Sequence, residues 1–96
     1  MTTKRQREQI KRLAKQCRSA YQADPTLWLS RDGEVVFDFP DYGGLPKRTA
    51  NCLSSDCVDV IQGFLVDVSY GSKRFTQRNL ERVLLDYANI GYALPY

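Results

Sequence analysis

Residues 4 to 22 constrain the fold most, because no glycine or proline interrupts the chain before Pro25. At the helical step of about 100° per residue, the apolar side chains of this segment gather on one side. This pattern predicts an amphipathic helix over 4–22 whose apolar side packs against the rest of the protein. The apolar positions are Ile10, Leu13, Ala14, Cys17, Ala20 and Tyr21.

The opposite side of this helix is strongly basic. Residues 1–23 hold seven basic and one acidic side chain, whereas residues 24–96 hold seven basic and ten acidic ones. The net charge of +3 therefore comes entirely from the first helix. Such an asymmetry indicates an acidic partner for that helix. The predicted partner-binding residues are Lys4, Arg5, Arg7, Lys11, Arg12, Lys15 and Arg18.

This charge works against the stability of the helix itself. Basic side chains near a helix N-terminus oppose its macrodipole, and like charges four residues apart, such as Lys11 and Lys15, repel each other. A surface kept for binding is expected to carry such a cost. The alternative interpretation is a solvated face, or one that pairs with the aspartates of 55–70 in the same molecule.

The segment 26–39 predicts a β-hairpin. Two runs rich in β-forming residues, 26–30 and 34–39, flank Asp32-Gly33, and Asp-Gly is typical of a tight turn. Alternation along the second run places Val35, Phe37 and Phe39 on the core face. Because a lone hairpin is marginal in water, this one is expected to pack on helices.

The remaining chain predicts one loop and two helices. Residues 40–53 contain two prolines and two glycines and are expected to be irregular. A helix is predicted over 55–70, capped by Ser54 or Ser55 and ended by Gly71. Its apolar arc is Cys57, Val58, Val60, Ile61, Phe64, Leu65 and Val68.

Another helix is predicted over 76–90, capped by Thr76 and ended by Gly91. Its expected buried stripe is Leu80, Val83, Leu84, Tyr87 and Ile90. Tyr92 and Tyr96 of the tail are expected to close the core over the hairpin, the alternative being that they stack on a base or fill a partner's pocket. The elements together predict one small α+β domain over 1–96, with three helices and a two-stranded ribbon around one core.

Enzymatic chemistry has little support in the sequence. The chain has no histidine, so the commonest general base is missing. The three cysteines, Cys17, Cys52 and Cys57, lack the fourth ligand of a typical zinc site and are interpreted as free thiols, Cys17 as a core residue. No metal or cofactor is expected. A metal-dependent enzyme that uses Asp38 and Asp41 is retained only as a third hypothesis.

A glycine turn between the last two predicted helices raises a second nucleic-acid hypothesis. The helix after this turn opens with Gln77, Arg78 and Asn79, followed by Arg82, as recognition helices of helix-turn-helix proteins do. However, the preceding helix is acidic, and its charge would repel phosphate. The secondary candidate residues are Gln77, Arg78 and Arg82, together with Lys47 and Arg48 of the predicted loop.

The sequence therefore predicts a small, non-enzymatic interaction protein. Its basic helix is expected to engage an acidic partner, first of all the nucleic-acid backbone. The alternative is a protein-binding adaptor or inhibitor, for example a phage- or plasmid-type inhibitor of a host enzyme, that uses the same face. No run approaches the roughly 20 apolar residues of a membrane span, and no secretion signal is apparent, so a cytoplasmic protein without a membrane partner is expected.

Overall fold

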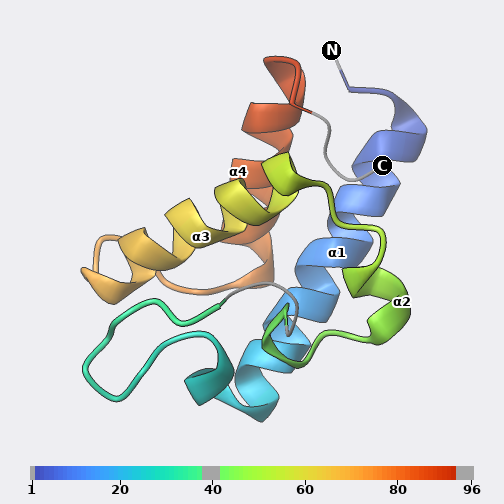
Figure 1. The fold of residues 1–96 in the computed structure, drawn as a ribbon. Helices are drawn as coiled ribbons and strands as arrows, with labels where there is room; N and C mark the ends of the chain where they lie inside the picture. Colours follow the sequence, from blue (N-terminus) through green and yellow to red (C-terminus); the bar gives the residue numbers. More distant parts are fainter. Residues whose placement is uncertain (1, 38–41, 93–96) are drawn as a thin grey trace.

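The protein is built from helices in the part of the chain that the computed structural model describes, residues 2–37 and 42–92 (Figure 1). Two short 3-10 helices, η1 and η2, lie between α1 and α2. The α-helices are α1 (Lys4–Ala23), α2 (Lys47–Ala50), α3 (Ser55–Ser69) and α4 (Gln77–Asn89), and the 3-10 helices are η1 (Pro25–Leu27) and η2 (Tyr42–Gly44).

The three long helices begin and end where local chemistry dictates. The side chains of Thr3, Ser54 and Thr76 each accept a hydrogen bond from the backbone N–H three residues further on, at 3.0–3.1 Å. Each such cap contributes about 1 kcal/mol. Gly71 and Gly91 follow α3 and α4 with φ of 77° and 104°, a conformation that favours glycine. The predicted spans of these helices are confirmed to within a residue, and so are the predicted caps at Ser54 and Thr76, whereas no cap was predicted at Thr3.

The helices α1 and α4 run side by side in opposite directions, and α3 crosses α4 (Figure 1). The backbone N–H of Thr2 donates to the side-chain oxygen of Asn89 at 3.1 Å, which ties the start of α1 to the end of α4. The short helix α2 lies on another side of α1, where the hydroxyl of Thr49 donates to Gln16 Oε1 at 2.8 Å. Among the described residues, no helix has both the length and the apolarity needed to cross a membrane.

One hydrophobic core joins these helices. The apolar stripe of α1 is buried or partly buried as predicted, and so is the predicted arc of α3. Burying a Leu, Ile, Val or Phe side chain contributes roughly 1.5–3 kcal/mol, so these stripes supply most of the driving force for folding. The residues of α1 with the lowest exposure are Ile10, Leu13, Ala14 and Cys17, and those of α3 are Cys57, Val58, Ile61, Phe64 and Leu65.

The predicted β-hairpin, and with it the α+β fold class, is wrong. Residues 28–37 contain only an isolated antiparallel bridge between Leu29 and Val35, and no strand or sheet forms in the described ranges. The tight turn is present at Gly33, and the backbone N–H of Ser30 donates to the carbonyl of Glu34 at 2.8 Å. Beyond the turn, the segment is held by core contacts instead of a strand ladder.

Side chains replace the missing ladder. Trp28 is fully buried, and its ring stacks on Phe37 with centroids 4.5 Å apart. The amide of Gln62 on α3 donates to the backbone carbonyl of Phe37 at 2.8 Å, so a helix side chain occupies an acceptor that a strand would otherwise use. The predicted inward orientation of Val35 and Phe37 is nevertheless confirmed. Phe39 lies outside the described residues.

Two further predictions need correction. The stretch 40–53 is not simply a loop, because it contains η2 and α2. On α4, Ala88 is buried in place of the predicted Tyr87 and Ile90, which are 38% and 71% exposed. The buried row follows the spacing i, i+4, i+8 from Leu80, which turns Tyr87 away from α1 and the core.

Candidate functional site

The predicted partner-binding residues of α1 lie on its outer surface. Six of the seven cationic side chains are exposed, and Arg18 is half-buried. Because the apolar stripe of α1 faces the core, its basic face points away from it, as the helical wheel predicts. The exposed residues are Lys4, Arg5, Arg7, Lys11, Arg12 and Lys15.

These cations have no acidic partner in the part of the molecule that the structure describes. The one ion pair between described residues joins Lys73 to Asp67, with 3.7 Å between Nζ and the carboxylate oxygen. The suggestion that the basic face pairs with aspartates of α3 therefore gains no ion pair within this part of the chain. The positive potential of α1 is available to an external anion.

The helix α2 extends the basic face beyond α1. Arg12 of α1 and Arg48 of α2 line one shallow hollow of about 330 Å³, together with Gln16 and Thr49. The hydrogen bond between Gln16 and Thr49 fixes how the two helices sit against each other. A predicted partner-binding residue of α1 and a secondary candidate from the predicted loop 40–53 thus line the same hollow. Lys47 and Arg48 are both exposed at this end of α2.

A second hollow of about 500 Å³ adjoins the first and shares Arg12 and Gln16 with it. Its lining adds Lys15 and Ser19 from α1, and Gly44 and Pro46 from the segment before α2. We refer to the two hollows together as the α1/α2 basic groove. No carboxylate and no aromatic ring is found among the described residues that line it.

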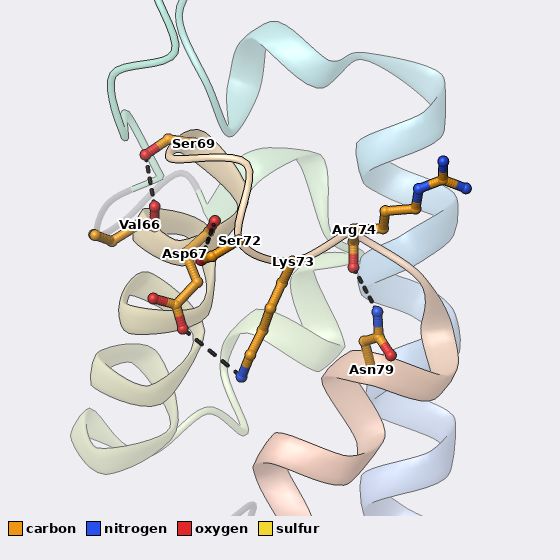
Figure 2. Close-up of polar contacts among 7 residues, drawn as sticks. All are labelled: Val66, Asp67, Ser69, Ser72, Lys73, Arg74 and Asn79. Atoms are coloured by element: carbon orange, nitrogen blue, oxygen red, sulfur yellow. Dashed lines mark hydrogen bonds and ion pairs between the residues drawn. The ribbon is translucent and has the colours of Figure 1, made fainter.

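The predicted recognition helix does not join this groove. Asn79 donates through its side-chain amide to the carbonyl of Arg74 at 2.9 Å, and the hydroxyl of Ser72 donates to the carbonyl of Asp67 (Figure 2). These polar groups serve the turn between α3 and α4. Arg82 lines a different hollow, which it shares with Asp86.

The other two candidates on α4 also lie apart from the groove. Gln77 is half-buried and Arg78 is exposed at the start of α4, directly after the turn that follows acidic α3. The structure therefore brings Arg48 to the α1/α2 basic groove, whereas Lys47, Gln77, Arg78 and Arg82 do not line it. Sequence reasoning could not foresee the part played by α2, because its four residues have no helical period of apolar side chains.

The three cysteines have different environments. Cys17 and Cys57 are buried in the core, where desolvation raises the pKa of both thiols, that of Cys57 to about 12. Such thiols are chemically inert, which confirms Cys17 as a core residue. Cys52 is exposed and lines the α1/α2 basic groove. It was not singled out by the sequence pattern.

No group of three or more potential metal ligands occurs among the described residues. Asp38 and Asp41, the proposed metal ligands of the third hypothesis, lie outside these residues. Because the chain has no histidine, a general base would have to be a carboxylate, a thiolate, a lysine amine or a tyrosine. Of the thiols, Cys17 and Cys57 are sequestered in the core.

No protein-family model, no curated protein and no solved structure matches this chain. The chemistry of the groove must therefore indicate what it binds. Guanidinium and ammonium groups are hydrogen-bond donors only, and the Gln16 Oε1 acceptor is already used by the Thr49 hydroxyl, which leaves the Gln16 amide N–H groups as further donors. A groove lined by such donors and free of carboxylates is suited to phosphate or carboxylate oxygens.

Proposed function

We propose that this protein binds the phosphate backbone of nucleic acid through the α1/α2 basic groove and the exposed cations of α1. The observation that carries the proposal is the convergence of Arg12 and Lys15 from α1 with Arg48 from α2, in adjoining hollows that no described carboxylate lines. Neutralisation of phosphates releases condensed counterions, and this release drives binding of such surfaces to nucleic acid.

The shape of the basic face favours a linear polyanion. The cations follow α1 from Lys4 to Arg18, a distance of about 21 Å at 1.5 Å per residue. A nucleic-acid strand presents phosphates in a continuous row over such a length, whereas carboxylates on a folded protein are scattered. Because the groove offers no described aromatic ring for base stacking, recognition is expected to depend on the backbone and little on sequence.

An acidic protein surface is the second candidate, and one observation favours it. The hollow between α1 and α2 has an apolar base that includes Leu13 and Leu53. Phosphate groups gain nothing from contact with these apolar side chains. In a protein partner, an apolar side chain next to a carboxylate could pack against them. This partner would make the protein an adaptor or inhibitor that docks through the same face.

The salt dependence of binding separates these functions. We would measure fluorescence anisotropy of a short labelled DNA duplex and of an RNA, at several salt concentrations. The wild type is expected to bind both, with log affinity falling linearly in log salt. The variant Arg12→Glu with Arg48→Glu should weaken binding by about tenfold or more and reduce the slope by about two.

The matched control is Arg31→Glu with Arg74→Glu, which makes the same change in net charge at two exposed positions outside the groove. This control should retain most of the affinity. Equal losses in both double variants would mean that total charge, not the groove, governs binding. Failure of the wild type to bind either nucleic acid at low salt would reject the nucleic-acid proposal and leave the acidic protein surface.

A further inference from the structure

A second groove, of opposite charge, lies between α3 and α4. It has a volume of about 450 Å³, and Tyr92, which follows α4, also lines it. Three carboxylates line it, those of Asp59 and Asp67 on α3 and Asp86 on α4. We refer to it as the α3/α4 acidic groove. It has no residue in common with the α1/α2 basic groove.

Only one of the three carboxylates of this groove has an ion-pair partner in the described part of the chain. Lys73 lies at the groove and pairs with Asp67 at 3.7 Å (Figure 2). Asp59 and Asp86 form no ion pair and no side-chain hydrogen bond with any described residue, and both are exposed. The lining of the groove itself holds one lysine and three carboxylates and is therefore negative, while Asp86 also borders the neighbouring hollow that Arg82 lines.

Two tyrosine rings form an aromatic wall beside these carboxylates. Tyr87 and Tyr92 pack edge to face, with centroids 5.0 Å apart, and each remains 38% exposed. The face of an aromatic ring attracts a cation, and arginine is the side chain most often found there. Carboxylates next to partly exposed tyrosine rings therefore match the two properties of a guanidinium group, its positive charge and its flat surface.

The floor of the groove carries a glycine that the fold does not require. Gly63 lies in the interior of α3, where glycine is less favourable than alanine. A Cβ atom built there would meet nothing within 4 Å. Gly63 shares a row with Asp59 and Asp67 at four-residue spacing, so a side chain at this position would enter the groove. Glycine keeps this space open.

We propose that the α3/α4 acidic groove is a docking site for an arginine or lysine side chain presented by a peptide segment of a partner protein. The argument for this occupant is charge complementarity, combined with the aromatic wall and the open floor. The proposal is independent of the proposed nucleic-acid function, because the residues that carry it lie on α3, α4 and the segment after α4, away from the basic face of α1.

Nuclear magnetic resonance of the ¹⁵N-labelled full chain tests this proposal. The probe is a short Gly/Ala peptide that contains two arginines, and the reference is the same peptide with two glutamates. The arginine peptide is expected to shift the backbone resonances of Gly63, Asp86, Tyr87 and Tyr92, and the glutamate peptide is not. The resonances of α1 should not move, since its cations repel the arginine peptide.

Two double variants locate the effect. Asp59→Asn with Asp86→Asn should weaken binding of the arginine peptide by about fivefold to tenfold, the size expected for two partly exposed ion pairs. Glu8→Gln with Glu34→Gln makes the same change in net charge at two exposed carboxylates outside the groove and should retain the affinity. Equal loss of affinity for the arginine peptide in both double variants would overturn the proposed docking site.

A steric variant provides a test that does not depend on charge. Gly63→Leu fills the open floor and is expected to abolish the peptide-dependent shifts while α3 remains helical by circular dichroism. Unchanged shifts in this variant would overturn the proposal. Shifts of the same resonances on concentrating the protein without peptide would also overturn it, because they would assign the groove to a second copy of this chain.

Discussion

The indole N–H of Trp28 donates a hydrogen bond to the backbone carbonyl of Gly43 at 2.8 Å, inside the core of the protein. This bond joins the segment after α1 to the segment before α2, fifteen positions apart in the chain. It satisfies the only polar atom of a fully buried side chain, whose burial without a partner would cost about 1–3 kcal/mol. The irregular half of the molecule is organised around this contact.

We predict that Gly43→Ala destabilises the protein by roughly 2–5 kcal/mol, the sum of a backbone cost and an overpacking cost. Gly43 has φ of 59°, and an added Cβ would lie 2.5 Å from the Trp28 ring. The measurement is urea unfolding followed by circular dichroism. Gly71→Ala is the matched control, because Gly71 has φ of 77° but open space around a Cβ. Equal losses in the two variants would show that contact with Trp28 does not matter.

The relationship between Trp28 and Gly43 also explains where sequence reasoning ends. The long helices were predictable, because their apolar period and the caps at Ser54 and Thr76 are properties of neighbouring residues. The structure of residues 26–37 was not predictable, since their alternation is that of a strand, whereas the observed structure depends on the Trp28 ring packed against distant Gly43. The alternation of apolar residues correctly predicted that Phe37 points into the core, but it wrongly predicted a β-strand.

The candidate site, like the fold, was predictable from the sequence only in part. The basic face of α1 could be read from the sequence, because charge and helical period determine it together. The contribution of Arg48 could not, since it depends on how α2 docks against Gln16 through Thr49. The α3/α4 acidic groove also escaped prediction, because Tyr87 was assigned to the buried stripe of α4 and is instead partly exposed.

Gly63→Ala is predicted to stabilise the protein by about 0.5–1 kcal/mol, the usual gain for replacing glycine in a helix interior. The added methyl group meets nothing within 4 Å, so no clash offsets this gain. Urea unfolding measures the change against the wild type. A loss of stability would mean that α3 needs its glycine for a structural reason, which would remove one support of the acidic groove.

Thiol chemistry should distinguish the three cysteines. In the native protein, a maleimide reagent at neutral pH is expected to modify Cys52 and to leave Cys17 and Cys57 unmodified, because the latter two are buried. Mass spectrometry should show one adduct per chain under native conditions and three in urea. If the groove binds nucleic acid, saturating DNA should slow the modification of Cys52, which lies among the cations that line it. Two or more rapid adducts would contradict the buried positions.

The buried thiols also predict how stability depends on pH. Burial raises the pKa of Cys57 to about 12 from a reference of 9.0, so the folded state keeps a proton that the unfolded state loses. The stabilising contribution is complete below pH 9 and is lost as the pH rises above it, by roughly 1.4 kcal/mol per pH unit. The free energy of unfolding should therefore fall between pH 9 and 11, and less steeply in Cys57→Ala. An equal slope in that variant would argue against this origin.

The last prediction concerns two exposed cations of α1, Lys15, which lines the α1/α2 basic groove, and Lys11, which does not. Lys11→Glu with Lys15→Glu should leave the free energy of unfolding within about 0.5 kcal/mol of the wild type, because both side chains are exposed. Repulsion of position 11 with Arg7, and of position 15 with Arg12 and Arg18, becomes attraction. The attraction between Glu8 and position 11 becomes repulsion, and positions 11 and 15 still repel each other as two glutamates, so the changes largely offset each other.

Binding should respond very differently from stability. An acidic partner now meets like charge, so the double variant is expected to lose nucleic-acid binding at physiological salt, and the remaining salt slope should fall by at least two. Anisotropy against labelled DNA measures this loss, and Arg31→Glu with Arg74→Glu again controls for net charge. Suppose instead that the variant binds as tightly as the wild type. The basic face would then be only solvated, because a phosphate contact cannot survive reversal of the charge that makes it.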